Sequence, residues 1–419
     1  MQRTSPSRAT WLVALAVAVA AMPAPTASAT ARHAGATAYP RPSARERRAG
    51  DRVALPHKRI RVIRRTIAPG LRYTKIVDRR TPRRIFVLRA DVANEPIAFD
   101  VTLAGPTLGY RAAVPEMARR AGALAAVNGD FSSRRVARPI HAFVEDGVFV
   151  QSAGGGSSFA VSANEHRVYV GRTRQVMTAT DAQTRITWRI DRWNQGPPGL
   201  GEIAAFSPAG GSLEMPPRNA CSVGLDPTSA PKPVADGPGL EQAFTIDRKA
   251  CRQERMPIGR DVVLSAVPGT DTATTLMSLS VGTDVTLTLG VGARRTFDVI
   301  GGGPLLLRDR HVTAAVGCTS WFCLAQPRTA LGVQADGRIL FVVVDGRHRR
   351  YSLGVSLLGL ARLMRRLGAV DAMNLDGGGS STMVIRGRVV NRPSDGTLRH
   401  VASSALVLPR PEPAASAAG

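Results

Sequence analysis

The stretch DAMNLDGGGSSTMV, residues 371–384, places an aspartate directly before three glycines and three hydroxyl side chains. Apolar residues precede and follow it, which favours a turn between two strands over a flexible linker. A phosphate-binding P-loop needs a lysine after its last glycine, and Ser380 stands there instead. A dinucleotide-binding fingerprint needs a helix next, whereas TMVIRGRVV, 382–390, is typical of a hairpin. A structural turn and an active-site turn both remain possible.

An active-site turn of this composition has a definite chemistry. Backbone N–H groups in a glycine-rich turn form a concavity that binds anions. The Asp376 carboxylate beside them can act as a base, a nucleophile or a stabiliser of an oxocarbenium ion. The hydroxyl groups can bind a substrate or bond only within their own turn, and no serine-hydrolase motif surrounds them. The candidate residues of this turn are Asp376, Gly377, Gly378, Gly379, Ser380, Ser381 and Thr382.

Other motifs accompany this turn in a fixed order. They are VNGDF at 127–131, GGGPLLL at 301–307, RTALGVQADGRILFVVVDGR at 328–347, NRPSDG at 391–396 and RHVASSALVL at 399–408. The combination resembles the phosphodiester glycosidase family, densely from Gly301 to Leu408 and more thinly back to about Ala90. The sequence departs from the family at Ser132, where a second aromatic residue usually follows Phe131.

The resemblance implies an exported enzyme that cleaves the bond between a sugar anomeric carbon and a phosphodiester oxygen. Because phosphate is a good leaving group, neutralising its charge and stabilising the transition state matter more than a strong general acid. Asp376 is then expected to face the anomeric carbon, with Asp130 or Asp345 as the second acid/base group. Arg328 is expected to offer its planar guanidinium to phosphate oxygens, helped by the glycine amides. Further substrate-binding candidates are Asn128, Arg347 and Arg399.

Structural roles stay open for most of these residues. Asn128 and Asp130 follow an apolar run and can form an Asx turn. Asp345, with the glycine after it, can form another hairpin turn. Arg347 and Arg399 can be solvated surface arginines, which is the commoner fate of this residue type.

The elements that must position these residues are mostly strands. Alternation in PRRIFVLRADV, 82–92, and IAFDVTLA, 97–104, predicts strands with one buried face. The pairs Asp146-Gly147, Asp336-Gly337 and Arg386-Gly387 separate apolar runs and predict hairpin turns. Leucines at helical spacing predict a helix within 352–369, and a shorter helix is expected within 112–125. The predicted class is α+β, with mainly antiparallel sheet and few helices.

The 419 residues divide into four predicted regions. Residues 1–29 have the charged, apolar and small-residue order of a signal peptide, with cleavage expected after Ala29. Residues 30–55 and 409–419 are predicted to be a disordered linker and tail. Residues 56–408 are expected to form the phosphodiester glycosidase-like domain, with an irregular insertion or small stapled subdomain near 195–260. The mature protein is expected to be secreted, without stable membrane insertion.

Four cysteines in an exported chain favour two disulfides, since disulfides persist outside the cytoplasm. We predict the local pairs Cys221–Cys251 and Cys318–Cys323, with free structural thiols as the alternative. Cysteine and histidine spacing predicts no zinc site. No cofactor is predicted, although a carboxylate-bound calcium ion stays an alternative.

The formal net charge of +25 does not by itself indicate nucleic-acid binding. Of the 56 basic residues only four are lysines, and this arginine bias runs through the whole chain. No RNA- or DNA-binding motif accompanies the charge. Attraction to an anionic wall polymer is a more specific expectation for an exported basic protein.

The sequence therefore favours a secreted glycosidase that hydrolyses a sugar-1-phosphodiester. The expected substrate is N-acetylglucosamine-1-phosphodiester-like and lies in an extracellular polysaccharide or cell-wall polymer. Two alternatives remain: a non-catalytic wall protein that binds anionic glycan, and a metal-dependent phosphodiesterase that cuts the P–O bond on the other side of the phosphate.

Overall fold

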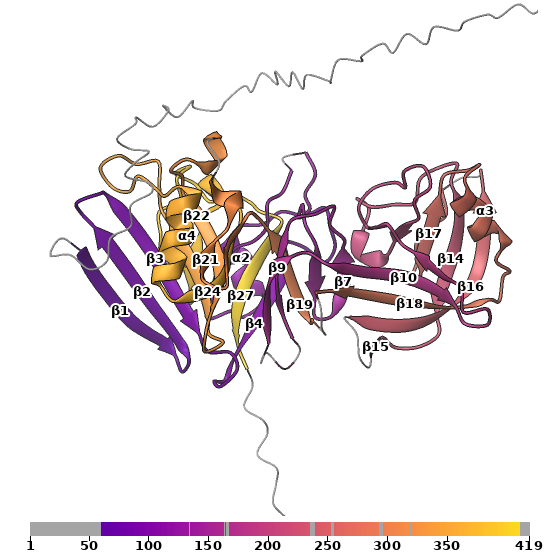
Figure 1. Cartoon of the computed structure of the whole chain (residues 1–419), viewed down its shortest axis with the longest axis horizontal. Helices are drawn as coiled ribbons and strands as arrows, with labels where there is room; N and C mark the ends of the chain where they lie inside the picture. Colours follow the sequence, from indigo (N-terminus) through magenta and orange to yellow (C-terminus); the bar gives the residue numbers. More distant parts are fainter. Residues whose placement is uncertain are drawn as a thin grey trace, which may run out of the picture. The chain divides into compact units, whose positions relative to one another are not determined.

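The computed structural model describes residues 60–410, except 134, 163, 165–166, 235–238, 253–254, 293–295 and 318–319. The predicted signal peptide, the linker and the tail beyond 410 lie outside the described residues. The described chain is mainly β-sheet with a few helices, as the predicted class requires (Figure 1). Each helix in this part of the chain is too short or too polar to cross a membrane.

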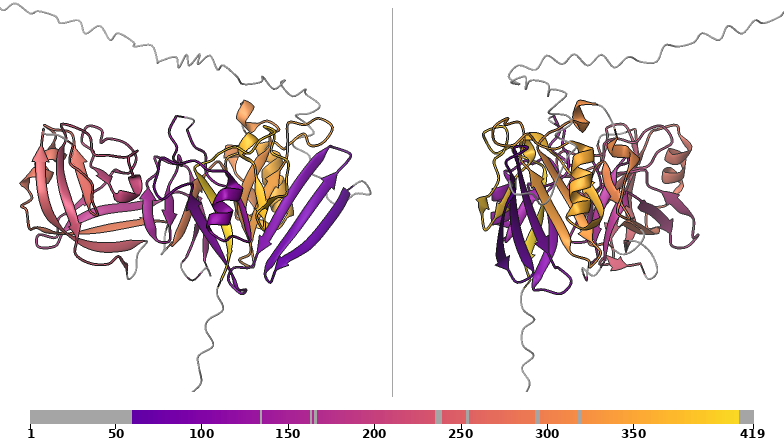
Figure 2. Two further views of the ribbon diagram at one scale, coloured as in Figure 1. Left: turned by 180° about the vertical axis from the view of Figure 1, so that it is seen from behind. Right: turned by 60° about the vertical axis from the view of Figure 1, so that its left-hand side comes forward.

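Two sheets carry the strands that lead to the candidate site. Sheet 1 orders its strands as β1 (Ile60–Ala68), β2 (Leu71–Asp78), β3 (Arg83–Ala90), β23 (Ile339–Val344), β22 (Arg328–Gln334), β24 (Ala369–Asn374), β20 (Leu305–Arg308) and β21 (His311–Val312). Sheet 2 orders its strands as β26 (Arg388–Val389), β25 (Met383–Ile385), β5 (Ala125–Asn128), β27 (Ser403–Pro409) and β4 (Ile97–Leu103). Strands from the start of the described chain thus pair with strands from its end, as Figures 1 and 2 show.

Two further sheets are formed by the middle of the chain. Sheet 3 contains β7 (Val148–Gln151), β6 (Phe143–Glu145), β19 (Asp298–Gly302), β8 (Ser157–Val161) and β9 (Val168–Arg172). Sheet 4 contains β11 (Thr187–Arg189), β10 (Gln175–Asp181), β18 (Asp284–Val291), β16 (Leu240–Cys251), β14 (Cys221–Pro227), β17 (Val262–Ala266), β13 (Ala204–Phe206) and β12 (Arg192–Trp193), with β15 (Lys232–Pro233) beside β16. Among the described strands, β12 and β13 pair in parallel and the other pairs are antiparallel.

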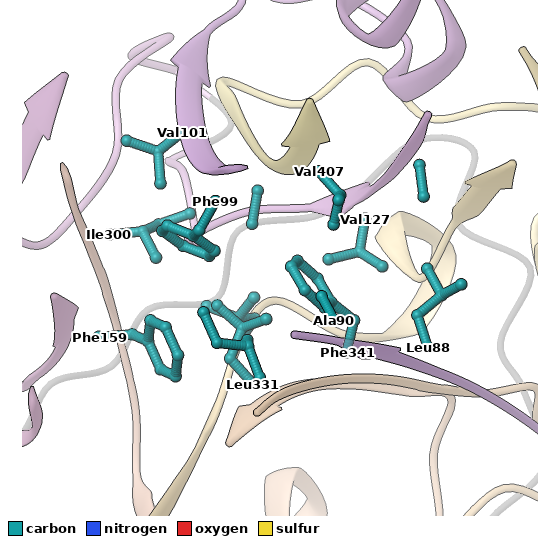
Figure 3. Close-up of a cluster of buried hydrophobic side chains, with 14 of the residues drawn as sticks. Leu88, Ala90, Phe99, Val101, Val127, Phe159, Ile300, Leu331, Phe341 and Val407 are labelled. Atoms are coloured by element: carbon teal, nitrogen blue, oxygen red, sulfur yellow. The ribbon is translucent and has the colours of Figure 1, made fainter. Parts of the chain in front are cut away.

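Alternation of side chains across the strands makes sheets 1 and 2 into a sandwich. In β23, Phe341 and Val343 enter the core between the sheets, while Leu340, Val342 and Val344 face the other way. Figure 3 shows Leu88, Leu331 and Phe341 of sheet 1 in one cluster with Phe99, Val127 and Val407 of sheet 2. Phe159 and Ile300 of sheet 3 complete this core. The period-two pattern of these strands therefore fixes which face is buried between the sheets.

A helix covers the outer face of each central sheet. The helix α4 (Leu357–Arg366) packs on β20 and β24 and buries its leucines in the cluster on the outer face of sheet 1, and α2 (Val114–Arg120) packs on β5, β25 and β27. Ser356 caps α4 by accepting a hydrogen bond from the Gly359 amide at 2.9 Å, and Gly368, at φ 94°, follows its end. Both helices are shorter than the predicted ranges because caps and glycines end them. The remaining helix, α3 (Asp271–Ser278), packs against sheet 4.

The three predicted hairpin turns are present. Asp146 and Gly147 have φ of 52° and 77° between β6 and β7, and Arg386 and Gly387 have φ of 47° and 74° between β25 and β26. Both pairs thus have the two left-handed residues that a type I′ turn requires. Between β22 and β23 the left-handed position is Gly337, at φ 83°.

The sequence predicted an irregular insertion or a small stapled subdomain near 195–260, and regular strands occupy part of that range. The strands β13, β14, β15 and β16 lie there and belong to sheet 4, whose hydrophobic core also includes residues of sheet 3 such as Phe149 and Val299. Proline and glycine in the connections, and the polar side chains of the long strand β16, hid the alternation of Phe244 and Ile246. The predicted disulfide Cys221–Cys251 is confirmed and joins facing residues of β14 and β16. The second predicted pair includes Cys318, which lies outside the described residues.

Candidate active site

Antiparallel pairing brings the motifs to one end of the sandwich. In sheet 1, Arg328 at the start of β22 pairs with Val344, the last residue of β23, and Ala330 pairs with Asn374, the last residue of β24. In sheet 2, Asn128 at the end of β5 pairs with Ser404 near the start of β27. The segments that follow β5, β23 and β24 therefore leave the sheets together.

Asn128 joins the two sheets at this end. Its Nδ2 donates to the backbone oxygen of Asp376 at 2.8 Å. Its Oδ1 accepts hydrogen bonds from the Thr329 hydroxyl at 2.7 Å and the Thr382 amide at 3.1 Å. The side chain is buried, and these bonds connect the end of β5 to the glycine-rich turn. Ser381 and Thr382 are buried in the same network, where the Thr329 hydroxyl also donates to Ser381 at 3.3 Å.

Asp376 lies at the surface of this network and is only partly buried. Its Oδ1 accepts from the Gly377 amide at 2.8 Å, and its Oδ2 accepts from the Ser380 hydroxyl at 2.6 Å. Burial raises the pKa of Asp376, and the charge of Asp130 acts in the same direction, while these hydrogen bonds and the charge of Arg399 act to lower it. The carboxylate is thus held in one orientation and is more basic than a free aspartate.

The glycines allow the turn to approach other segments closely. Gly378 has φ 63°, which disfavours any residue with a Cβ. A Cβ at Gly379 would lie 1.8 Å from Asp395 Oδ2, so this position admits only glycine unless the neighbouring loop moves. The Gly377 and Gly378 amides already donate within the site, to Asp376 and to the Pro327 oxygen. These two amides are therefore not free to bind an anion. The sequence had led us to expect that they would be free.

Two arginines flank the turn on either side of Asp395. The Arg347 guanidinium lies 3.6 Å from Asp395 Oδ1, and its Nε donates to Gln326 at 2.8 Å. Arg399 pairs with Asp395 Oδ2 and donates to the Ser380 hydroxyl at 3.4 Å. Their side chains are 19% and 38% exposed, so both cations border solvent beside the Asp376 turn. This geometry suits recognition of a phosphate group.

Arg328 differs from this pair because it is almost fully buried. Its Nε donates to the Val355 oxygen at 3.3 Å, and its Nη2 donates to the Leu324 oxygen at 2.9 Å and to the Phe322 oxygen. The guanidinium also lies over the Phe322 ring, 5.2 Å from its centre. Burial and the charge of Arg347 lower its pKa to about 9, although Asp376 acts to raise it. The structure thus directs Arg328 toward backbone carbonyls and not toward open solvent.

Asp345 is also buried and has several partners. Its Oδ1 accepts from Asn391 Nδ2 at 2.9 Å, and both of its oxygens accept from the Arg392 amide at 3.1 Å. Burial raises its pKa to about 6 against the lowering effect of these bonds. The carboxylate thus connects the loop that carries Asp395 to the end of β23.

Asp130 is turned toward a histidine. Its side chain has no exposed surface. Its Oδ1 lies 2.7 Å from His141 Nδ1 and accepts from the Phe131 amide at 2.7 Å, and its Oδ2 accepts from the His141 amide at 2.7 Å. The backbone oxygen of Gly129, which precedes Asp130, accepts a hydrogen bond from the Asp376 amide at 3.2 Å. The Asp130–His141 pair therefore lies next to the glycine-rich turn.

Sequence reasoning missed three residues of this site. Asp395 was visible only as part of NRPSDG, Asn391 as the first residue of that motif, and His141 as an isolated histidine. Asn391 contacts Asp345 46 residues away and His141 contacts Asp130 eleven residues away, while Asp395 pairs with the nearby Arg399 and with the more distant Arg347, and none of these pairs forms a motif that the sequence analysis recognised. The aromatic rings of Phe131 and Phe322, 5.9 Å apart, form a further part of the site wall.

The fold and this site define a β-sandwich protein with carboxylates and arginines gathered at one end of its central sheets. A sequence model of the phosphodiester glycosidase family matches residues 253–408, which contain Asp376, Asp345 and the three arginines. The resemblance to that family is thereby confirmed over this part of the chain.

Individual relatives match shorter segments. An uncharacterised protein derived from the SPbeta prophage of Bacillus subtilis is 33% identical over 126 residues, which is 30% of this chain and 19% of that protein. The mouse N-acetylglucosamine-1-phosphodiester alpha-N-acetylglucosaminidase is 38% identical over 68 residues, 16% of this chain and 13% of the mouse protein. The matched segments thus span less than a fifth of these curated relatives.

A solved structure shares the fold more widely. It is described as an exported protein of Burkholderia pseudomallei, covers 84% of this chain and 96% of its own, and has a TM-score of 0.61 at 20% identity. At this identity the likeness establishes the fold alone.

Proposed function

We propose that this chain is a secreted phosphodiester glycosidase that hydrolyses a sugar-1-phosphodiester in an extracellular polysaccharide or wall polymer. The observation that carries the proposal is the position of Asp376, a partly buried residue whose carboxylate is held by Gly377 and Ser380, in a turn beside which Arg347 and Arg399 both pair with Asp395. The family match over 253–408 and the name of the mouse relative support the same reaction class.

The charges of the site suit the charge changes of this reaction. As the bond from the anomeric carbon to the phosphate oxygen breaks, positive charge develops on the sugar and negative charge on the phosphate. Asp376 would stabilise the sugar cation, while Arg347 and Arg399 would hold the phosphate oxygens. Both arginines already contact Asp395, so an incoming phosphate would share them with that carboxylate.

The buried candidate residues would hold this arrangement in position. Arg328 would hold the chain near Phe322 in place, Asp345 would hold the loop of Asp395, and Asn128 would hold the turn of Asp376. We expect these residues to affect activity through position, because each is buried and already hydrogen-bonded.

A product assay on a synthetic N-acetylglucosamine-1-phosphodiester tests the proposal. Release of free sugar and a phosphomonoester is the expected result. Sugar-1-phosphate together with the free alcohol would instead identify a phosphodiesterase, and turnover that stops with a chelator would identify its metal-dependent form. Binding of the anionic glycan without any turnover would identify the non-catalytic alternative.

A further inference from the structure

The Asp130–His141 pair has the geometry of an acid/base dyad that no motif of the sequence indicated. Asp130 is fully covered, and its two oxygens are engaged by the Phe131 amide, the His141 amide and His141 Nδ1. It therefore cannot approach an anomeric carbon or a water molecule as readily as Asp376 can. A buried carboxylate bonded to one imidazole nitrogen instead fixes the tautomer and the orientation of the ring.

The other nitrogen of the imidazole is open. His141 Nε2 makes no hydrogen bond to the described residues, and it is not among their buried atoms that lack a partner. The side chain is 19% exposed, so solvent reaches the ring at this nitrogen. With Nδ1 donating to Asp130, Nε2 is the position that takes up and releases a proton.

Glycines provide the space that this ring occupies. A Cβ at Gly156 would lie 2.2 Å from His141 Cδ2, and a Cβ at Gly301 would lie 2.2 Å from His141 Cβ. The Gln151 amide donates to the His141 backbone oxygen at 3.0 Å. Backbone, carboxylate and glycine contacts thus hold the imidazole in one place, which is what a proton-transfer group needs.

We propose that His141 Nε2, oriented by Asp130, removes the proton from the water molecule that attacks the anomeric carbon. This inference rests on the proposed glycosidase function. The water oxygen forms a bond to the anomeric carbon, and the bond from that carbon to the phosphate oxygen breaks with its electron pair on the oxygen. The water proton passes to Nε2, leaving a hemiacetal and a phosphomonoester anion, and is later released to solvent.

The electrostatics agree with this role. Burial lowers the pKa of His141, but the hydrogen bond and the negative charge of Asp130 outweigh it and raise the pKa above its ordinary value. Among the described residues Asp130 is the charged group that acts on this ring, since the neighbours Phe131, Gln151, Gly156 and Gly301 are uncharged. A base must be neutral to act, so activity should rise with pH through the pKa of His141.

The variant His141→Asn tests the inference, because the asparagine amide can still donate to Asp130 while Nε2 is lost. We expect kcat to fall by about 10²-fold to 10⁴-fold with KM nearly unchanged. The rise of kcat/KM with pH that belongs to His141 should disappear. His311→Asn, on the exposed strand β21, is the matched control and should behave as wild type.

Asp130→Asn separates the two members of the pair. Without the carboxylate charge the pKa of His141 falls, so the remaining activity should show its rise at lower pH than wild type. If Asp130 were itself the base, this variant would lose that rise altogether. Should His141→Asn fold poorly, His141→Ala with added imidazole replaces it, and imidazole should restore part of the turnover.

Wild-type kcat and an unchanged pH profile in folded His141→Asn would overturn the inference while leaving the glycosidase function intact. So would a His141→Ala variant whose losses imidazole does not reduce. Wild-type protein that releases no sugar from any sugar-1-phosphodiester would overturn the proposed function, and this inference with it.

Discussion

At the scale of single residues, the structure separates three aspartates that are alike in sequence. Asp376 is partly exposed, whereas Asp130 and Asp345 are buried and bonded to His141 and to Asn391 with Arg392. A carboxylate must reach the substrate to act on it, so we assign the direct role to Asp376. The other two are expected to act through their partners.

Asp376→Asn should lower kcat by at least about 100-fold and leave KM and the melting temperature nearly unchanged. Asparagine keeps the size of the side chain and one acceptor oxygen, but removes the negative charge that would stabilise the transition state. Steady-state kinetics and thermal melting measure both effects, with exposed Asp226→Asn as the control. A well-folded variant with near-normal kcat would rule out the catalytic assignment. Lost stability with proportionate activity would favour a purely structural turn.

Arg347→Ala and Arg328→Ala should differ in their effects on KM and on the stability of the fold. Loss of Arg347 removes a phosphate contact and should raise KM about tenfold or more, with little change in melting temperature. Loss of Arg328 leaves the Phe322, Leu324 and Val355 carbonyls without their donor and should destabilise the fold by about 3 kcal/mol. Kinetics and denaturant unfolding of both variants decide this. A stable Arg328→Ala enzyme with a raised KM would restore the phosphate-binding role expected from the sequence.

At the scale of elements, sheet 4 stands apart from the site. Its core is a separate cluster, built from residues such as Val223, Phe244 and Leu287, and its disulfide joins neighbouring strands. The site is formed instead by segments that follow strands of sheets 1 and 2. Stability of sheet 4 and chemistry at the site should therefore be separable.

The double variant Cys221→Ser with Cys251→Ser should test that separation. The bridge spans a sequence separation of 30 residues, for which the chain-entropy model gives about 3–4 kcal/mol of stabilisation. We expect a lower melting temperature with kcat/KM close to wild type at temperatures where the variant is folded. Activity lost from a fully folded variant would show that sheet 4 shapes the site.

At the scale of the whole molecule, three aspartates meet where sheets 2 and 3 adjoin. Asp100 of β4, Asp146 of the β6–β7 turn and Asp298 of β19 place carboxylate oxygens within 4.8 Å of one another. Burial, and then the neighbouring carboxylates, raise the pKa of Asp298 to about 8 and that of Asp100 to about 7. The sequence predicted no cofactor, with a carboxylate-bound calcium ion as the alternative, and this stays a prediction.

These raised pKa values predict how stability depends on pH. Between the ordinary aspartate pKa of 3.8 and about 8, the folded protein binds more protons than the unfolded chain. The contribution of these groups to stability is therefore complete below about pH 4 and is lost as pH rises through 7 to 8. Melting temperatures measured across this range should fall with rising pH, and Asp298→Asn should flatten that fall. An equally steep curve for this variant would contradict the prediction, and Asp226→Asn is the control.

Much of the local structure follows from the sequence because it depends on neighbouring residues. The Asp146-Gly147 and Arg386-Gly387 turns need left-handed residues, and alternation in β4 marks its more buried face. The prediction of a single buried face was wrong for β3, because Ile85 and Val87 are buried on the face opposite Phe86 and Leu88. The glycine-rich turn and its aspartate were recognisable for the same reason. The strand β16 was not, because its polar residues and the surrounding prolines conceal the alternation.

The hydrogen-bond partners and the exposure of the site residues were decided by the tertiary structure. Asp130 contacts His141 eleven residues away, Asp345 contacts Asn391 across 46 residues, and Arg347 reaches Asp395 from the segment that follows β23, whereas Arg399 lies only four residues from Asp395. Burial is also a property of the assembled layers, and it places the Arg328 guanidinium against backbone carbonyls, while its expected role as a phosphate ligand stays a prediction. The sequence by itself therefore determined which residue types and turns were available. The packing of the sheets decided which of them reach solvent, because exposure and hydrogen-bond partners arise from contacts between distant segments.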